Sequence, residues 1–314
     1  MSQDTKIVIV GPGAMGCFFA ARLSAAGHEV WLLARTAHQA GLLNARGLVL
    51  EDGGSALHIP WQTATDDAAR IGMADVVLLC VKAYDTEQAL HSVMPAVGSD
   101  TAVVTLQNGI GHTDLISGCV DPARIVAGTT AHGATRITEG HVRHAGTGET
   151  VIGGLHPSAR CMLERVQRLF TGAGIQTAIT QDIHAALWGK LIINAAINPL
   201  TAIFRIPNGV LAGDETLQAL VRSVVGEACG VAARVGIRLP YPDPLAKVFA
   251  VCRATAANIS SMHQDVRAGR QTEIDAINGA IVRSGRAHGV PTPVNSLLVD
   301  LVTAAAQLRT PRPA

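Results

Sequence analysis

The segment Lys6-Ile-Val-Ile-Val-Gly-Pro-Gly-Ala-Met-Gly16 decides how the first half of this chain folds. Its mostly apolar residues 6–10 predict a buried β-strand, and glycines follow directly at positions 11, 13 and 16. Gly11 permits a tight turn, Gly13 lets a ligand approach the backbone, and Gly16 lets the next helix pack on the strand. This G-x-G-x-x-G pattern between a strand and a helix predicts a dinucleotide site, with the pyrophosphate at the helix N-terminus.

The end of the second predicted strand, residues 29–33, indicates which dinucleotide binds. An acidic residue there would bind a ribose 2′-hydroxyl, but the chain reads Leu33-Ala34-Arg35, which offers a cation for a 2′-phosphate instead. Lys82 follows another predicted strand and is placed to add a second positive charge near the adenosine. We therefore expect NADPH rather than NADH, although an exposed cation without a role stays an alternative at either position. The turn residues expected to bind the cofactor are Gly11, Pro12, Gly13, Ala14, Met15 and Gly16.

The order of apolar patterns along the chain predicts the architecture. Short apolar strands alternate with helical patterns up to about residue 180, which is typical of a parallel, doubly wound α/β sheet. No strand pattern follows. We therefore predict an N-terminal Rossmann-like NADP-binding domain, residues 1–180, and a C-terminal all-α substrate and catalytic domain, residues 181–314. The helices expected in the second domain span residues 183–203, 211–235, 247–262, 273–289 and 295–308.

Finer details of the two predicted domains follow from local signals. Glycines and threonines with alternating apolar residues over 131–153 predict antiparallel strands at the edge of the sheet. Asp214 and Asn295 are expected to cap helices, because each precedes a helical pattern with a side chain that accepts backbone N–H groups. The apolar helices 211–235 and 295–308 suit either core packing or dimer contact, so a homodimer stays open.

Composition excludes several classes of protein. The chain has 314 residues, 48% of them hydrophobic and 16% charged, which is enough for two cores. Its net charge is +1 without a lysine or arginine block, which gives no support to nucleic-acid or anionic-membrane binding. Only 3% of residues are aromatic, which disfavours base stacking. Apolar runs such as residues 74–81 fall short of the roughly 18 residues of a membrane span, so none is expected.

Cysteines and histidines point to a reducing compartment and no metal site. The six cysteines form no C-x-x-C pair and suit free thiols better than disulfides. The twelve histidines show no H-E-x-x-H spacing, and His141 with His144 lacks companion ligands in the sequence. Residues 2–6 are polar and lead straight into a strand, so we expect no signal peptide and a cytoplasmic protein.

A second informative stretch is Leu187-Trp-Gly-Lys-Leu-Ile-Ile-Asn-Ala-Ala-Ile-Asn-Pro-Leu200. Lys190, Asn194 and Asn198 recur at i, i+4 and i+8, so they share one face of an otherwise apolar helix. Burial would lower the pKa of the lysine and let it donate a proton near neutral pH. Pro199 would kink the helix where Asn198 projects. The alternative is a solvated surface face.

Taken together, these motifs resemble the ketopantoate reductase (2-dehydropantoate 2-reductase) family, from Lys6 to about Asn295. The resemblance implies NADPH-dependent reduction of the small 2-keto acid ketopantoate to D-pantoate in pantothenate synthesis. Its landmarks are residues 11–16, Val81-Lys82-Ala83-Tyr84, Leu106-Gln-Asn-Gly109, Lys190-Leu-Ile-Ile-Asn194, Asn198-Pro-Leu-Thr201, the block from Ser260 to Asp275 that contains Gln271-Thr-Glu-Ile-Asp275, and Asn278-Gly279.

The resemblance also implies roles for single residues. Lys190 would be the general acid, and Glu273 would bind the substrate hydroxyl and help set the state of the lysine. Asn108 would lie beside the nicotinamide and help position Lys190, so that Asn108 and Glu273 also belong to the cofactor site. The residues implied to hold the substrate are Asn108, Asn194, Asn198 and Ser261, with Ser261 near the carboxylate.

The chemistry of ketone reduction asks for such a set. Hydride attack builds negative charge on the carbonyl oxygen, which a cationic lysine stabilises before it donates its proton. Glu273 follows Thr272, a plausible N-cap, so we expect it in a first helical turn where the dipole favours its ionised form. Twelve residues separate Ser261 from Glu273, about 18 Å on one straight helix, so we expect the chain to break at Gly269.

Other functions stay open at this point. A reductase of another 2-keto acid, or a 3-hydroxy acid dehydrogenase, would also join a nucleotide-binding domain to a helix with Lys-x-x-x-Asn. The Thr272-Glu-Ile-Asp275 block and the Asn198-Pro199 pair argue against the dehydrogenase. A non-enzymatic NADP-binding sensor would keep the glycine turn but has no reason to hold Lys190 with Glu273. For any of the reductases, the active site is expected where the two domains meet.

Overall fold

The computed structural model describes residues 5–61 and 63–308. Its internal contacts divide the chain into two compact units. The N-terminal unit comprises Met1–Gln107 and His112–Ile183, and the helical unit comprises Asn108–Gly111 and His184–Ala314. Four residues from the middle of the chain, 108–111, therefore belong to the helical unit. The expectation about a signal peptide concerns residues 1–4, which lie outside the described residues.

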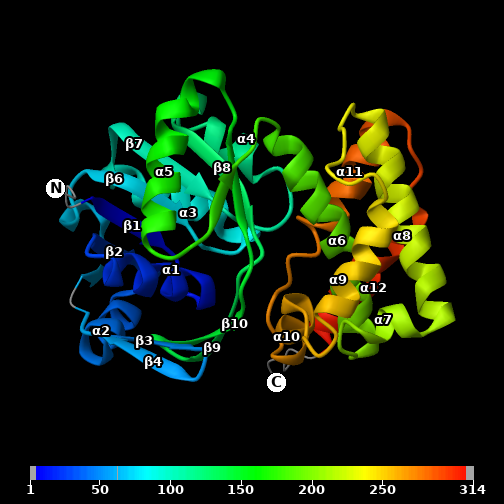
Figure 1. Ribbon diagram of the computed structural model, residues 1–314, viewed down its shortest axis with the longest axis horizontal. Coiled ribbons are helices and arrows are strands. Elements are labelled where there is room, and N and C mark those ends of the chain that lie inside the picture. The colour runs from blue at the N-terminus through cyan, green and yellow to red at the C-terminus, as the bar shows by residue number, and fades with distance from the viewer. Residues whose placement is uncertain (1–4, 62, 309–314) are drawn as a thin grey trace. The chain divides into compact units, whose positions relative to one another are not determined.

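An eight-stranded sheet forms the centre of the N-terminal unit (Figure 1). Its strand order is β12-β11-β8-β7-β6-β1-β2-β5, and every neighbouring pair is parallel except β8 with β11. The predicted Rossmann-like, doubly wound sheet is thus confirmed. The strands are β1 (Lys6–Val10), β2 (Glu29–Leu33), β5 (Ala64–Thr65), β6 (Ala74–Leu79), β7 (Val97–Thr105), β8 (Ile125–Thr130), β11 (Thr150–Gly154) and β12 (Thr177–Ile179).

Both faces of this sheet are buried, which explains why its strands are apolar without alternation. On β1, Ile7 and Ile9 join the core that contains residues of α1 and α5, whereas Val8 and Val10 join the core that contains residues of α3 and α4. The helices of this unit are α1 (Ala14–Ala25), α2 (Ala37–Arg46), α3 (Thr86–Val93), α4 (His112–Ser117) and α5 (Arg160–Gly172).

The glycine turn joins β1 to α1 with almost no space to spare. Gly11 has a φ of +94°, a conformation that favours glycine. A Cβ atom added to Gly16 would lie 2.1 Å from the carbonyl oxygen of Gly11, so α1 can pack this closely only with glycine there. A Cβ atom on Gly13 would meet no atom within 4 Å. The turn is therefore tightly packed between Gly16 and Gly11, and it leaves open space beside Gly13.

A second sheet corrects one prediction. The alternating pattern over 131–153 does give strands, but only β11 joins the edge region of the main sheet. The hairpin β9 (Gly133–Thr138) and β10 (His141–Gly146) instead pairs with β3 (Leu48–Asp52) and β4 (Ser55–Ile59), in the order β4-β3-β10-β9. Leu50 of β3 and Val142 of β10 are paired and share a core with α1, beside which this sheet lies in Figure 1. Alternation identified the strands, but it carries no information about which sheet they join.

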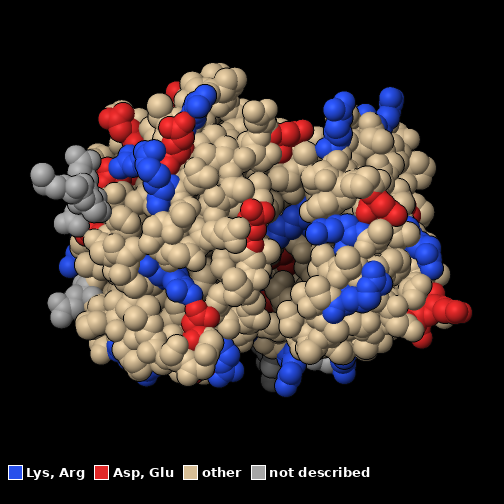
Figure 2. Space-filling model, in the orientation of Figure 1, with Lys and Arg blue, Asp and Glu red and all other residues tan. Residues whose placement is uncertain are grey.

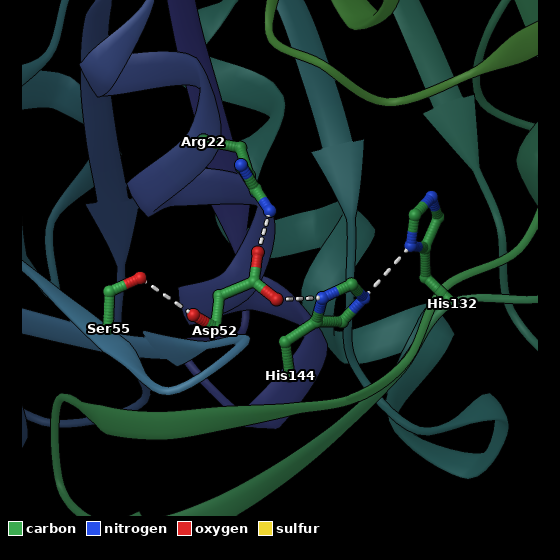
Figure 3. A network of polar contacts seen from close by, with 5 residues as sticks. All are labelled: Arg22, Asp52, Ser55, His132 and His144. Atoms are coloured by element: carbon green, nitrogen blue, oxygen red, sulfur yellow. Dashed lines mark hydrogen bonds and ion pairs between the residues drawn. The ribbon is translucent and has the colours of Figure 1, made fainter.

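A partly buried polar chain connects the second sheet to α1 (Figure 3). The guanidinium of Arg22 pairs with Asp52, whose Oδ1 lies 2.9 Å from Nδ1 of His144. Nε2 of His144 lies 3.1 Å from Nδ1 of His132, and the His144 ring stacks on Phe18 with 4.8 Å between centroids. Within the described residues, Nε2 of His132 is buried without a hydrogen-bond partner. Burial lowers the pKa of His132, with His144 and Arg22 acting in the same direction and Asp52 opposing them.

The helical unit is built around α6 (Ile183–Phe204), which buries Leu191, Ala195 and Ile197 in the core. By length and hydropathy α6 alone, among the described helices, could cross a membrane, but 72% of its apolar window is buried inside the protein, as in a core helix. The remaining helices are α7 (Val210–Gly213), α8 (Glu215–Arg234), α9 (Pro244–Ala254), α10 (Ser261–Arg267), α11 (Asn278–His288) and α12 (Pro293–Gln307).

Helix boundaries in this unit differ from the sequence pattern in places. Asp214 caps α8 as predicted, since its Oδ1 accepts the backbone N–H of Leu217 at 2.9 Å. The helix predicted over 247–262 is wrong, because α9 ends at Ala254 and α10 begins at Ser261. Asn295 does not cap α12, whose N-cap is Thr292; it lies inside the helix, fully buried, and its side chain binds elsewhere.

Charged side chains do not gather by sign on the visible surface. On the face in Figure 2, basic and acidic groups are interspersed on both units among a majority of uncharged residues. This agrees with the near balance of 25 lysines and arginines against 24 aspartates and glutamates.

The contact at Gly16 predicts a large difference between two similar substitutions. Gly16→Ala forces a methyl group into the carbonyl of Gly11 and should destabilise the protein by about 1–3 kcal/mol. Gly41→Ala places the same methyl group on an exposed residue of α2 with no atom within 4 Å, and should stabilise the protein by up to about 1 kcal/mol. Urea unfolding measures both, and equal effects would contradict the packing argument.

The buried histidine chain predicts that stability depends on pH. Because the pKa of His132 is lowered in the folded protein, the unfolded chain binds the extra proton first as pH falls below about 6.5. Stability should therefore fall below that pH by at most about 1.4 kcal/mol per pH unit from this group. Thermal unfolding from pH 7.5 to 5 should show a shallower slope for His132→Phe. His58→Phe, on the exposed strand β4, is the control and should keep the wild-type slope.

Candidate active site

The polar face of α6 is not a solvated surface. Asn198 is only 7% exposed, and Lys190 and Asn194 are half-buried. Burial lowers the pKa of Lys190 to about 8, while the charge of Glu273 acts in the opposite direction. A lysine in this state exchanges its proton near neutral pH. The alternative of an exposed polar stripe is therefore wrong for this helix.

Gly189 allows another segment to approach the helix beside Lys190. A Cβ atom at Gly189 would lie 2.8 Å from Cγ of Pro240 and 3.1 Å from the ring of Tyr241. A larger residue would push this segment away from the helix. Glycine inside a helical pattern is the sequence signal for such a contact, but the sequence does not identify the partner.

Glu273 lies in a turn and not in a helix. The predicted chain break at Gly269 is confirmed, with φ at +64°, and Glu273 follows it almost completely buried, with 6% exposed. Its carbonyl accepts the N–H groups of Ala276 and Ile277, both at 3.1 Å, and α11 begins only at Asn278. The expected position in a first helical turn is therefore wrong, and the helix-dipole argument for this carboxylate does not apply.

Asn108 reaches Glu273 through a close backbone contact within the helical unit. The N–H of Ile110 donates to the carbonyl of Ala276 at 3.2 Å. Gly109, with φ at +88°, would place a Cβ atom 2.3 Å from the same carbonyl oxygen, so the contact requires glycine. Nδ2 of Asn108 then donates to Oε2 of Glu273 at 3.3 Å. This bond joins residues 165 positions apart, and Glu273 in turn acts on Lys190.

Ser261 is connected to the other end of the α6 polar face. It is the exposed first residue of α10, directly after Ser260, whose Oγ caps that helix by accepting the N–H of His263 at 3.1 Å. The hydroxyls of Ser260 and Thr201 lie 2.7 Å apart, and Thr201 also donates to the carbonyl of Asn198 at 3.0 Å. Sequence reasoning did not assign Ser260, although serine at this place is a typical N-cap.

The glycine turn of the N-terminal unit fits a pyrophosphate. Space is open at Gly13, where a Cβ atom would meet nothing within 4 Å. Gly13 is also the N-cap of α1 and has no side chain to cap the helix, and the first turn contains no acidic residue. The backbone N–H groups and the positive end of the helix dipole therefore suit a phosphate at this position.

The two predicted cations follow two strands, β2 and β6, that both pair with β1 in the same unit. Arg35 comes after β2, is 63% exposed along its side chain, and forms an ion pair with Asp85. Asp85 is the last residue of the short 3-10 helix Ala83–Asp85, for which Lys82 is the N-cap. Sequence reasoning did not identify Asp85, because 50 residues separate it from Arg35.

Over residues 5–61 and 63–308, no cluster of three or more histidine, cysteine, aspartate or glutamate side chains could hold a metal ion. The six cysteines are free thiols, and burial raises the pKa of Cys17 to about 12.

Comparison with known proteins gives a consistent result along the chain. The family model described as ketopantoate reductase PanE/ApbA matches residues 7–157, and the model of its C-terminal part matches residues 182–306. The 2-dehydropantoate 2-reductase of Vibrio cholerae is 35% identical over 96% of this chain and 98% of its own length. The enzyme of the same name from Pyrococcus horikoshii is 36% identical over the same shares.

Solved structures agree with this result. A PanE/ApbA family ketopantoate reductase from Ralstonia eutropha has a TM-score of 0.87 and 34% identity, over 97% of this chain and 99% of that one. D-mandelate dehydrogenase, solved with NADH and anilino(oxo)acetate, has a TM-score of 0.90 and 29% identity over the same shares. Because two family models together match most of the chain and full-length relatives exceed 30% identity, the chain belongs to the ketopantoate reductase family.

Proposed function

We propose that this protein reduces 2-dehydropantoate to D-pantoate with NADPH, as a step of pantothenate biosynthesis. The observation that carries the proposal is the gathering of Lys190, Glu273 and Asn108 in one unit, with the pKa of the lysine lowered to about 8. The name 2-dehydropantoate 2-reductase, carried by relatives at 31–36% identity, supports the choice of substrate. The N-terminal unit would bind the cofactor, and the helical unit would bind substrate and transfer the proton.

Lys190 would act as the general acid. When bound, NADPH supplies the hydride that adds to the ketone carbon, and negative charge develops on the carbonyl oxygen. The ammonium of Lys190 stabilises this charge and gives up its proton to form the hydroxyl. The charge of Glu273 raises the pKa of the lysine against the effect of burial, which helps keep it protonated at neutral pH. Glu273 would also bind the substrate hydroxyl.

Uncharged groups would hold the substrate around the lysine. Asn194 and Asn198 lie on its helix face, and Ser261 follows the Ser260 cap that is bonded to Thr201. Their amide and hydroxyl groups can orient a keto acid without adding further titratable groups, with Ser261 near the carboxylate. Asn108, already bonded to Glu273, would contribute to the same site.

The cofactor would use backbone groups at one end and cations at the other. Residues 11–16 would bind the pyrophosphate, Arg35 the 2′-phosphate, and Lys82 would add charge near the adenosine. At the nicotinamide end, Asn108 and Glu273 are the proposed contacts. A cytoplasmic location stays a prediction from the sequence, and a homodimer stays open.

One structural relative favours a second candidate function. D-mandelate dehydrogenase, with anilino(oxo)acetate bound, resembles this chain as closely in fold as the reductases do. A reductase of an aryl 2-keto acid would use the same lysine and a different pocket wall. Comparing kcat/KM for ketopantoate with that for phenylglyoxylate separates the two functions, and the larger value identifies the substrate class.

Loss of the lysine should slow catalysis strongly with little effect on cofactor binding. Lys190→Ala should lower kcat for ketopantoate reduction by about 100-fold or more, because both the acid and the cation are lost. NADPH oxidation at 340 nm measures the rate, and NADPH fluorescence measures binding, which should stay at the wild-type level. In the wild type, kcat should fall as pH rises above about 8, since the ammonium then loses its proton. A rate that keeps rising to pH 9.5 would contradict the role of Lys190.

The ion pair of Arg35 predicts opposite effects for its two partners. Arg35→Ala should raise the NADPH Kd by about 10- to 100-fold, the range for hydrogen bonds to a charged group, and leave the NADH Kd nearly unchanged. Asp85→Asn removes the carboxylate that competes with the 2′-phosphate for Arg35 and should lower the NADPH Kd. Fluorescence titration with both nucleotides tests this, and an unchanged NADPH Kd in Arg35→Ala would exclude Arg35 from the site.

A further inference from the structure

Pro199 creates a local problem inside α6. In a regular helix the N–H of residue 199 would donate to the carbonyl of Ala195, but proline has no N–H. Ala195 is fully buried, so water cannot supply the missing donor. Ala195 also lies directly after Asn194 and three residues before Asn198. The carbonyl therefore needs a donor from another element at the centre of the proposed substrate face.

Asn278 supplies that donor. Its Nδ2 lies 3.1 Å from the carbonyl oxygen of Ala195, and the residue is completely buried. Asn278 is the first residue of α11 and directly follows the turn that begins at Glu273. One side chain thus ties α6, next to its polar face, to the segment that carries the proposed partner of Lys190.

Hydrogen bonds that involve Asn295 and Glu227 fix the orientation of the Asn278 amide. Glu227 of α8 is an acceptor, and it receives the backbone N–H of Asn295 at 2.9 Å and Nδ2 of Asn295 at 2.7 Å. Because the Asn295 amide nitrogen faces Glu227, its Oδ1 faces Asn278 and accepts from Nδ2 at 3.0 Å. The Ala195 carbonyl and Oδ1 of Asn295 are both acceptors, so the NH2 group of Asn278 must face them and its oxygen must point away.

This arrangement leaves one buried polar atom without a partner, which an apolar core residue would avoid. Within the described residues, Oδ1 of Asn278 is buried without a hydrogen-bond partner. An unsatisfied buried amide oxygen destabilises a fold, so a position needed only to fill space would be better served by an apolar side chain. The amide at this position is thus explained by the bond that it makes with α6.

We propose that Asn278, oriented by Asn295 and Glu227, is a positioning residue that sets how the Lys190 face of α6 meets the Glu273 turn during reduction. Asn278 acts through Ala195 and touches neither substrate nor cofactor. The proposal rests on the proposed function for its catalytic consequence. The coupling itself concerns only the helical unit and can be measured without turnover.

The test compares loss of the Asn278 donor with Pro199 in place and with a backbone N–H restored at position 199. Asn278→Leu removes the donor while keeping the number of side-chain heavy atoms, as Asn208→Leu does at the control position, and should lower kcat for ketopantoate about 10-fold or more while changing NADPH Kd little. Because Glu273 raises the pKa of Lys190, poorer alignment should also move the alkaline limb of kcat below pH 8. Pro199→Ala restores a backbone donor for Ala195. In that background, Asn278→Leu should change kcat by less than about 2-fold, since the carbonyl no longer depends on Asn278.

A matched control separates positioning from stability. Asn208 is also a buried asparagine of the helical unit, with one hydrogen bond to Thr255 and an Oδ1 without a partner in the described residues. Asn208→Leu should lower the melting temperature without moving the pH limb of kcat. If Asn278→Leu does the same and no more, Asn278 has only a structural role and the proposal is overturned. Should that variant not fold, Asn278→Ala, which also removes the donor to Ala195 but with a smaller side chain, carries the same comparison, with Asn208→Ala as its control.

A measurement without substrate keeps this proposal distinct from the proposed function. The pH dependence of Lys190 acetylation by acetic anhydride, followed by mass spectrometry, reports the titration of the lysine directly. A shift to lower pH in Asn278→Leu, reduced by Pro199→Ala, supports the coupling even if the wild type reduces no 2-keto acid, an outcome that would overturn only the proposed function. An unshifted profile in an active enzyme overturns the coupling alone.

Discussion

Burial of the Lys190 ammonium in an apolar helix is the constraint on which the proposed chemistry depends. Desolvation alone would favour the neutral amine, and a neutral amine can neither stabilise an oxyanion nor donate the proton. The carboxylate of Glu273 opposes this effect, and the result is a pKa of about 8. The surrounding amides and hydroxyls add hydrogen-bonding capacity without adding charge, so the state of the lysine is set mainly by two opposing influences.

The two units use different physical means to bind their ligands. The N-terminal unit would hold a cofactor with backbone N–H groups, and its main requirement is the absence of side chains at Gly11, Gly13 and Gly16. The helical unit relies on side chains that come from distant segments, such as Asn108 and Glu273. Backbone sites of the first kind can be recognised from a short local pattern. Sites of the second kind depend on the packing of the whole unit.

This difference explains what could be predicted from the sequence. The glycine turn and the spacing of Lys190, Asn194 and Asn198 are local, periodic signals, and the structure places them as expected on a strand–helix turn and one helix face. The Asp85 partner of Arg35 and the sheet that receives β9 and β10 depend on contacts between distant segments, which no short pattern encodes. The turn at Glu273 was missed for another reason. Thr272 looks like an N-cap, but residues 273–277 form a turn and the helix begins only at Asn278.

Pro199 shows how a functional helix departs from the most stable helix. Its ring removes a hydrogen bond from the middle of α6, where any other residue would have kept it. The carbonyl left without a donor accepts instead from a buried asparagine of α11. That asparagine is oriented by a second asparagine, from α12, which is held in turn by a carboxylate from α8. Such a network is costly to bury and specific in geometry, because each bond needs an amide nitrogen as donor and a carbonyl, amide or carboxylate oxygen as acceptor. A helix that served only to fill the core would need none of these groups, so their presence beside the polar face indicates that the direction of that face matters.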